Sequence, residues 1–394
     1  MGLDRATRIG VLGAGSMGSG IAQVAAVAGH PVVLADVSEA ALERAVAGVR
    51  KGLDRDVEKG RRTAEEVAAI LGRISTDAVD GHYSSFEGCG LVIEAILEDL
   101  AVKQHAFTAI EGAVGPAAVL ATNTSSLSVT AIAAACQHPE RVLGVHFFNP
   151  APVMPLVEVV GGHATDPART AEVRALVDGW GKTTVLAADT PGFIVNRVAR
   201  PFYGEALRLL EEGVADHATI DWAMRDIGGF RMGPFELMDL IGNDINYAVT
   251  RSVFESFAYD PRYRPSLVQK RLVDARLFGR KAGRGYYDYR AGAPAPEPVR
   301  DEALGRQIVD RILAMLINEA ADAVFLRIAS PADVDLAMTR GVNYPKGLLA
   351  WADEIGVPVV LSRLEALQAE YGEDRYRPSP LLRRMARDGR RFLG

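Results

Sequence analysis

The stretch from Arg8 to Asp36 restricts the fold more than any other part of this 394-residue sequence. A short β-branched run, RIGVL, leads directly into the glycines of GAGSMGSG, and apolar residues at helical spacing follow. A second apolar run, Val32 to Ala35, ends at Asp36. A lone GxGxxG is weak evidence, but strand, glycines, helix, second strand and terminal acid in this order are typical of a dinucleotide-binding βαβ unit.

Each part of this motif has its own expected role. Gly13 makes the tight turn, Gly15 lets the backbone approach a pyrophosphate, and Gly18 lets the helix pack on the strand. The helix N-terminus then faces the phosphates. Asp36 would accept hydrogen bonds from the adenosine ribose and repel a 2′-phosphate, so we expect NAD rather than NADP. The alternative is a structural glycine turn followed by a surface acid.

Apolar runs continue to alternate with helical stretches as far as residue 187. Strands are expected at 91–96, 119–122, 142–147, 155–160 and 183–187, and helices at about 40–60, 63–72 and 99–114. In an open parallel sheet, ligands bind beyond the carboxyl ends of the strands. The polar cluster Asn123 to Ser126 follows one such strand and His146 ends the next, so substrate chemistry is expected there.

His146 and Glu158 are the residues on which the functional prediction depends. Glu158 is flanked by valines in PLVEVV and would be costly to bury alone, and His146, twelve residues earlier, is its best candidate partner. An imidazole that takes a proton from an alcohol near neutral pH needs a partner for its other ring nitrogen. The alternative is a structural histidine whose hydrogen bonds are satisfied within the fold.

From Phe193 onward the pattern changes to helices alone, beginning with one long apolar helix expected from Phe193 to Glu211. This helical pattern is then repeated. Matching residues keep an offset of 114 positions from Ile194 to Gly242, and RYRPS at Arg262 is repeated at Arg375 with an offset of 113. This regular repetition indicates a second copy of one helical domain. In the second copy Asp310 replaces Asn196, so that copy is expected to be structural. The matched pairs include Ile194 with Ile308, Arg197 with Arg311, Glu205 with Glu319, Asp221 with Asp335, and Gly242 with Gly356.

The predicted fold class is α/β, with a Rossmann-type dinucleotide-binding domain followed by two tandem all-helical domains. We expect an NAD-binding domain over 1–190, a helical substrate or dimerisation domain over 191–290, a Pro- and Ala-rich linker over 291–302, and the second helical copy over 303–394.

Composition excludes several classes of protein. The net charge of -6 argues against nucleic-acid binding. Only two cysteines, Cys89 and Cys136, occur, which fits a reduced cytosolic compartment and no disulfide or metal scaffold. No uncharged run reaches the roughly 18 to 20 residues that a membrane span needs. We therefore expect a soluble cytoplasmic protein without metal, nucleic-acid or membrane partners.

Four motifs carry a resemblance to a known family. NTSSL from Asn123, HFFNP from His146, LVEV from Leu156 and DTPGFIVNR from Asp189 resemble the NAD-dependent (S)-3-hydroxyacyl-CoA dehydrogenases, and the resemblance covers essentially the whole chain. The tandem helical domains look most like those of the bacterial phenylacetate-pathway 3-hydroxyadipyl-CoA dehydrogenases. Those proteins usually have a longer segment between the two helical repeats.

The resemblance implies a role for each site residue. His146 would be the general base for the 3-hydroxyl proton, and Glu158 would orient its imidazole and stabilise the imidazolium. Ser125 and Asn196 would hydrogen-bond the reacting oxygens of the substrate. The implied cofactor contacts are Gly13, Gly15, Gly18, Asp36, Glu98, Lys103 and Asn149.

The implied reaction is NAD-dependent oxidation of an (S)-3-hydroxyacyl-CoA to a 3-oxoacyl-CoA, most of all 3-hydroxyadipyl-CoA. The alternatives are a short-chain 3-hydroxybutyryl-CoA dehydrogenase, a 3-hydroxyacid or carnitine dehydrogenase, and a non-catalytic, crystallin-like NAD-binding relative. A dicarboxylate would need a cation, for which Arg197, Arg200 and Arg231 are candidates unless they are salt-bridge partners. In the family the helical domain mediates dimerisation, so the two copies are expected to form an internal pseudo-dimer, with or without a further homodimer.

Overall fold

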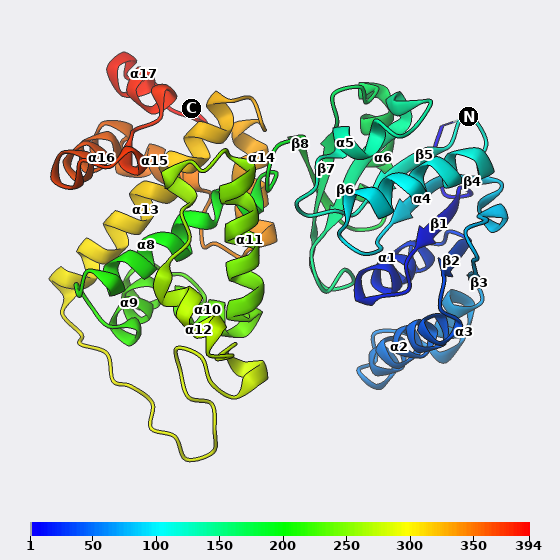
Figure 1. Ribbon diagram of the computed structural model, residues 1–394, viewed down its shortest axis with the longest axis horizontal. Helices are drawn as coiled ribbons and strands as arrows, with labels where there is room; N and C mark the ends of the chain where they lie inside the picture. The colour runs from blue at the N-terminus through cyan, green and yellow to red at the C-terminus, as the bar shows by residue number, and fades with distance from the viewer. Residues whose placement is uncertain (1) are drawn as a thin grey trace. The chain divides into compact units, whose positions relative to one another are not determined.

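The computed structural model describes residues 2–394, which divide into two compact units after Phe193 (Figure 1). The first unit contains an eight-stranded sheet. Its strands are β1 (Arg8–Leu12), β2 (Val32–Asp36), β3 (Ile74–Ala78), β4 (Cys89–Glu94), β5 (Val119–Thr122), β6 (Val142–Phe147), β7 (Leu156–Gly161) and β8 (Thr183–Ala188). Its α-helices are α1 (Ser16–Val27), α2 (Glu39–Glu58), α3 (Ala64–Leu71), α4 (Leu100–Ala113), α5 (Val129–Ala133) and α6 (Pro167–Asp178).

The strand order is β3-β2-β1-β4-β5-β6-β7-β8. Strands β1 to β6 are parallel, β7 runs antiparallel to β6, and β8 is parallel to β7. One apolar core joins the sheet to α1, α2, α3 and α6, and a second core joins its other face to α4 and α5. This arrangement confirms the predicted Rossmann-type fold, and it places the carboxyl ends of β1, β2, β4, β5 and β6 along one edge.

Two glycines allow α1 to lie close to the sheet. Gly13 has a φ of +106°, and a Cβ there would lie 2.6 Å from the carbonyl oxygen of Ala95. A Cβ on Gly18 would lie 1.7 Å from the carbonyl oxygen of Gly13. Any larger residue would therefore push the helix away from β1.

The structure also contains elements that the sequence analysis did not predict, namely β3, α5 and α6. Strand β3 is an edge strand in which Ser75 and Thr76 are exposed, so it lacks an apolar pattern. The single helix predicted from Phe193 to Glu211 is wrong in one respect. It is divided into α7 (Val195–Val198) and α8 (Arg200–Glu211), because Pro201 has no N–H to donate to the carbonyl of Arg197.

The second unit is built from helices in two related sets. The first set is α7, α8, α9 (His217–Trp222), α10 (Pro234–Ile241), α11 (Asn243–Ser256) and α12 (Leu267–Asp274). The second set is α13 (Glu302–Phe325), α14 (Pro331–Gly341), α15 (Leu348–Ile355), α16 (Val357–Tyr371) and α17 (Pro380–Asp388). Over residues 2–394, none of the helices is long and apolar enough to cross a membrane.

The same capping interaction occurs in both sets. The Asp221 carboxylate accepts hydrogen bonds from the first backbone N–H groups of α10, and Asp335 does the same for α15. A Cβ on Gly233 or Gly347 would lie 2.3 Å from these carboxylates. Burial raises the pKa of Asp221 to about 7. The repeat in the sequence is therefore a repeat in side-chain interactions as well.

The two sets pack against each other through α8 and α13, and their buried ion pairs are reciprocal. Arg197 Nε lies 2.5 Å from Glu319 Oε1, and the equivalent Arg311 Nε lies 3.0 Å from Glu205 Oε2. Tyrosine hydroxyls complete both pairs, with Tyr263 donating to Glu319 and Tyr376 donating to Glu205. Arg197 and Arg311 are equivalent residues, and so are Glu205 and Glu319, and each arginine pairs with the glutamate of the other set. Such an exchange of equivalent contacts shows that the two sets are related by a pseudo-twofold axis.

Candidate active site

His146 and Glu158 lie directly opposite each other on the antiparallel strands β6 and β7. His146 Nδ1 is 2.7 Å from Glu158 Oε2, and the two side chains are 8% and 0% exposed. The pairing predicted from the sequence is therefore confirmed. A short hydrogen bond between a buried imidazole and a buried carboxylate fixes which ring nitrogen faces the acid.

The alternation of the two strands explains why both side chains point the same way. Val145 and Phe147 on β6, and Val157 and Val159 on β7, belong to the apolar core on the α6 side of the sheet. The residues between them, His146 and Glu158, point to the other face. The rings of Phe148 and Phe193 lie 4.6 and 5.9 Å from the imidazole, between ring centres. Nε2 has no hydrogen-bond partner among residues 2–394, which leaves it available for proton transfer.

Ser125 lies in a loop that a single carboxylate holds in place. Glu98 Oε1 accepts hydrogen bonds from Thr124 Oγ1, Ser125 N and Ser126 Oγ at 2.5, 3.1 and 3.0 Å. Burial raises the pKa of Glu98, but these hydrogen bonds and the charge of Lys103 outweigh that effect, so its pKa lies below the ordinary value. The Ser125 backbone is thereby fixed, and Glu98 is placed to position it.

Asn123 connects this loop to the strand that carries the histidine. Its Oδ1 atom accepts a hydrogen bond of 2.8 Å from the backbone N–H of Phe147. The loop after β5 and the end of β6 therefore form one hydrogen-bonded structure. Sequence reasoning placed Asn123 in the polar cluster but gave it no separate role.

Lys103 is buried in an ion-pair network. Its Nζ atom lies 2.5 Å from Glu94 and 3.3 Å from Glu98, and the Lys103 and Glu94 side chains are each 1% exposed. Thr122 Oγ1 donates to the second oxygen of Glu94 at 2.7 Å. Sequence reasoning missed Glu94, although an acid within the apolar run LVIEAI gives the same signal as Glu158. A direct contact between Lys103 and the cofactor stays a prediction.

The turn after β1 has the form that a dinucleotide pyrophosphate requires. Gly15 precedes α1 without a side-chain cap, and a Cβ built there would have no atom within 4 Å. The N-terminus of α1 is therefore open to an anion. Asp36, at the end of β2, accepts hydrogen bonds from Ala14 N and Ser38 N at 2.7 and 2.9 Å. The residues present thus fit a bound dinucleotide.

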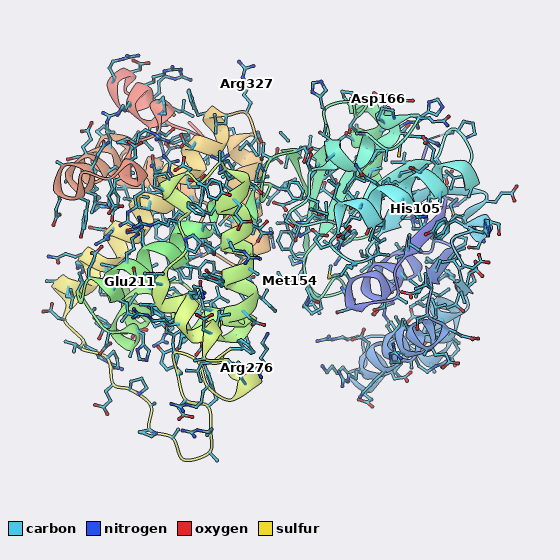
Figure 2. All side chains as sticks on the ribbon, in the orientation of Figure 1. His105, Met154, Asp166, Glu211, Arg276 and Arg327 are labelled. Carbon is cyan, nitrogen blue, oxygen red and sulfur yellow. The ribbon has the colours of Figure 1, made fainter. Side chains whose placement is uncertain are left out.

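Two further contacts order the segment that follows His146. Ser16 Oγ donates to Asn149 Oδ1 at 3.5 Å, which connects HFFNP to the start of α1. Lys182 Nζ donates to the carbonyl oxygens of Ala151 and Met154 at 2.5 and 2.9 Å (Met154 is labelled in Figure 2). Burial lowers the pKa of Lys182. Both ends of the connection from β6 to β7 are therefore held.

The remaining predicted residues belong to the second unit. Asn196 is in α7 and is partly exposed. Arg197 is buried against Glu319, so it is a salt-bridge partner rather than an available cation. Arg231 is exposed, and Arg200 is buried.

Comparison with known families assigns both units. Residues 8–190 match the NAD-binding domain of 3-hydroxyacyl-CoA dehydrogenase, and residues 192–289 and 308–391 match the C-terminal domain of that enzyme. The chain belongs to the 3-hydroxyacyl-CoA dehydrogenase family. The predicted family, enzyme class and NAD cofactor are thereby confirmed, and an acyl-CoA substrate is consistent with this membership.

Individual members of the family resemble the chain over different lengths. It is 42% identical to the 3-hydroxyadipyl-CoA dehydrogenase of Escherichia coli, over 96% of this chain and 97% of the relative. It is 44% identical to a probable 3-hydroxybutyryl-CoA dehydrogenase of Bacillus subtilis, over 72% of this chain and 97% of the relative. A crystal structure described as 3-hydroxybutyryl-CoA dehydrogenase from Escherichia coli superimposes with a TM-score of 0.92, at 40% identity and 98% coverage of both chains.

Proposed function

We propose that this 3-hydroxyacyl-CoA dehydrogenase oxidises (S)-3-hydroxyadipyl-CoA to 3-oxoadipyl-CoA, and that His146 removes the proton of the 3-hydroxyl group. The hydrogen bond between His146 Nδ1 and Glu158 Oε2 is the observation that carries this mechanism. Because Nδ1 faces the acid, Nε2 is the nitrogen that takes the proton. The buried carboxylate then stabilises the imidazolium and keeps the ring in one orientation. Bound NAD supplies the hydride acceptor.

Other side chains position the substrate and the cofactor in this proposal. The Ser125 hydroxyl and the Asn196 amide donate hydrogen bonds to the reacting oxygens, which orients the alcohol and stabilises charge that develops on oxygen. Glu98 acts through the loop that it holds, since its hydrogen bonds fix the Ser125 backbone. The groups proposed to hold NAD are Gly13, Gly15, Gly18, Asp36, Glu98, Lys103 and Asn149.

The choice of substrate draws on a relative that matches 96% of the chain and is named as a 3-hydroxyadipyl-CoA dehydrogenase. A second candidate is 3-hydroxybutyryl-CoA, which the names of the Bacillus subtilis relative and of the solved Escherichia coli structure favour. The two substrates differ in the length of the acyl chain and in the distal carboxylate. A non-catalytic NAD-binding role would require the His146 and Glu158 pair to be present without a reaction.

The deciding experiment measures kcat/KM with 3-hydroxyadipyl-CoA and with 3-hydroxybutyryl-CoA, from NADH absorbance at 340 nm. Higher kcat/KM on the dicarboxylate supports the proposal. Higher kcat/KM on the short monocarboxylate would overturn the choice of substrate. Stabilisation of the protein by NAD without turnover of either compound would favour the non-catalytic alternative.

We also propose that the chain acts as a monomer in the cytoplasm. The face that each helical set offers to the other is already used within one chain. Both Cys89 and Cys136 are free thiols, which agrees with a reducing compartment.

A further inference from the structure

Arg200, in the first turn of α8, is a buried cation without an acidic partner. It is 8% exposed, and its Nη1 atom donates to Thr250 Oγ1 at 3.2 Å. Its Nε atom has no hydrogen-bond partner, and no carboxylate of residues 2–394 forms an ion pair with it. Buried arginines elsewhere in this unit, such as Arg197 and Arg311, each face a glutamate. A buried guanidinium without an anion is costly and requires an explanation.

Two tyrosines complete the surroundings of this cation. The guanidinium carbon of Arg200 lies 4.9 Å from the centre of the Tyr203 ring. Tyr344, from the second helical set, is 6% exposed and its hydroxyl has no hydrogen-bond partner. Burial lowers the pKa of Arg200, and the two tyrosines only partly oppose this effect. Arg200, Tyr203, Thr250 and Tyr344 are called the Arg200 cluster below.

The internal repeat provides a control for the structural importance of this cluster. The two helical sets have the same fold, so each member has an equivalent 114 positions away in the other set. All four equivalents are apolar, and the fold therefore does not require polar groups at these positions. In the order Arg200, Tyr203, Thr250 and Tyr344, they are Ala314, Ile317, Leu364 and Phe230. Tyr344 and Phe230 also contact each other, with ring centres 5.0 Å apart, as residues beside a pseudo-twofold axis do.

We propose that the Arg200 cluster binds the distal carboxylate of a dicarboxylyl-CoA substrate. This inference rests on the proposed function, and it assigns the residues that select the substrate. A guanidinium with free donors, together with a buried hydroxyl, offers the charge-assisted hydrogen bonds that a carboxylate requires. The bound carboxylate would supply the anion that the chain itself does not provide to Arg200.

The length of the acyl chain agrees with this assignment. Arg200 lies four positions after Asn196, and only Ala199, which keeps helical φ and ψ, separates α7 from α8. Four residues of helical backbone correspond to about 6 Å. In a 3-hydroxyadipyl group the carboxyl carbon is three C–C bonds from C3, or about 4 Å away. If Asn196 binds an oxygen at C3, the distal carboxylate lies within reach of the Arg200 side chain. Arg197 is unavailable because Glu319 occupies its guanidinium.

Two of the four residues of the cluster also border a cavity, whereas Arg200 and Tyr344 do not line it. Tyr203 and Thr250 line a cavity of about 480 Å³ among α8, α11 and the start of α12. Gly204 also lines the cavity and has no neighbour within 4 Å of a Cβ position, whereas its equivalent Asn318 hydrogen-bonds the backbone of Ser379. Glu211, labelled in Figure 2, lies at the same cavity. The first helical set therefore has a glycine beside this cavity, where the second set has an asparagine side chain bound to its own backbone.

The test compares two substrates that differ only in the charged end, 3-hydroxyadipyl-CoA and 3-hydroxyhexanoyl-CoA. Arg200→Met keeps much of the side-chain length and removes the charge. We expect kcat/KM to fall at least about 30-fold for the dicarboxylate and to change less than about 3-fold for the monocarboxylate. Equal losses on both substrates, or no loss on either, would overturn the assignment. If the unaltered enzyme turned over neither compound, the proposed function itself would fail, and the assignment with it.

A second variant keeps the inference testable if Arg200→Met does not fold. Tyr344→Phe introduces the residue that already stands at the equivalent position, Phe230, so the fold should tolerate it. We expect kcat/KM for the dicarboxylate to fall about 5- to 10-fold, with the value for 3-hydroxyhexanoyl-CoA unchanged. Phe230→Tyr is the matched control and should leave the ratio of the two values unaltered. A Tyr344→Phe enzyme with the ratio of the unaltered protein would contradict the assignment.

Discussion

The carboxylate of Glu158 meets the imidazole of His146 because their strands pair with these two residues in register, at a separation of 2.7 Å between Nδ1 and Oε2. Neither side chain depends on a flexible loop for its position. The backbone hydrogen bonds of β6 and β7 therefore set the geometry on which proton transfer depends. This relationship leads to two predictions about catalysis, and the helical unit leads to two about stability and assembly.

His146→Ala should lower kcat at least about 100-fold, because the group that removes the hydroxyl proton is lost. NAD binding should be nearly unchanged, since His146 itself is not among the proposed cofactor contacts. Turnover is followed at 340 nm, and NAD affinity is followed by titration calorimetry. Comparable losses of turnover and NAD affinity would instead indicate a histidine that maintains the fold.

Glu158→Gln should reduce kcat by about 10- to 100-fold, because a neutral amide can orient the ring but cannot stabilise the imidazolium by charge. The matched control is Glu140→Gln. Glu140 also contacts a histidine, His138, but both side chains are more than half exposed. Steady-state kinetics should show no change for the control. An unchanged kcat in the Glu158 variant would contradict the proposed role of the buried acid.

Asp221→Asn should change how the stability of the protein depends on pH. The pKa of Asp221 is about 7 in the folded protein, above the value of about 4 for an unfolded chain. Between these values the folded state binds more protons, so the contribution of this group to stability is present at low pH and is lost as pH rises through 7. Thermal unfolding from pH 5 to 8 should show a flatter decline in Tm for the variant. Parallel curves for both proteins would refute this expectation.

Light scattering coupled to gel filtration should give a mass near the 42.2 kDa of one chain. The reason is that both reciprocal ion pairs between α8 and α13 already form within the chain. Measurements over a range of protein concentrations exclude a weak association. A mass near twice that of the chain would show that another surface drives dimerisation.

The sequence was most informative where a local pattern has one structural outcome. RIGVL forms β1 over the predicted residues, and Ser38, Thr63 and Asp99 cap the helices that follow them. The pairing of His146 with Glu158 followed from the cost of burying a lone carboxylate. The same argument applies to Glu94, whose partner Lys103 is nine residues away.

Contacts between distant residues could not be predicted in this way. Arg197 and Arg200 are three positions apart in the sequence NRVAR. Their neighbours in sequence do not indicate which of the two forms an ion pair. Glu319, which neutralises Arg197, is 122 residues away in sequence. Strand β3 was missed for a different reason, because the edge of a sheet does not require apolar residues on both faces. In both cases the structure depends on a residue or strand that is distant in sequence: Glu319 for Arg197, and β2 for β3.

The reciprocal ion pairs of the helical unit, Arg197 with Glu319 and Arg311 with Glu205, also restrict how this polypeptide can be shortened or altered during evolution. A chain that stopped before α13 would retain Arg197 and Glu205 but lose the partner of each. Two such shortened molecules could form the same ion pairs between Arg197 of one and Glu205 of the other. Truncation would therefore favour dimerisation through this face. A charge reversal at Arg311 would not be compensated by one change at Glu205, because Arg311 also pairs with Glu212 and Glu205 also pairs with Arg375.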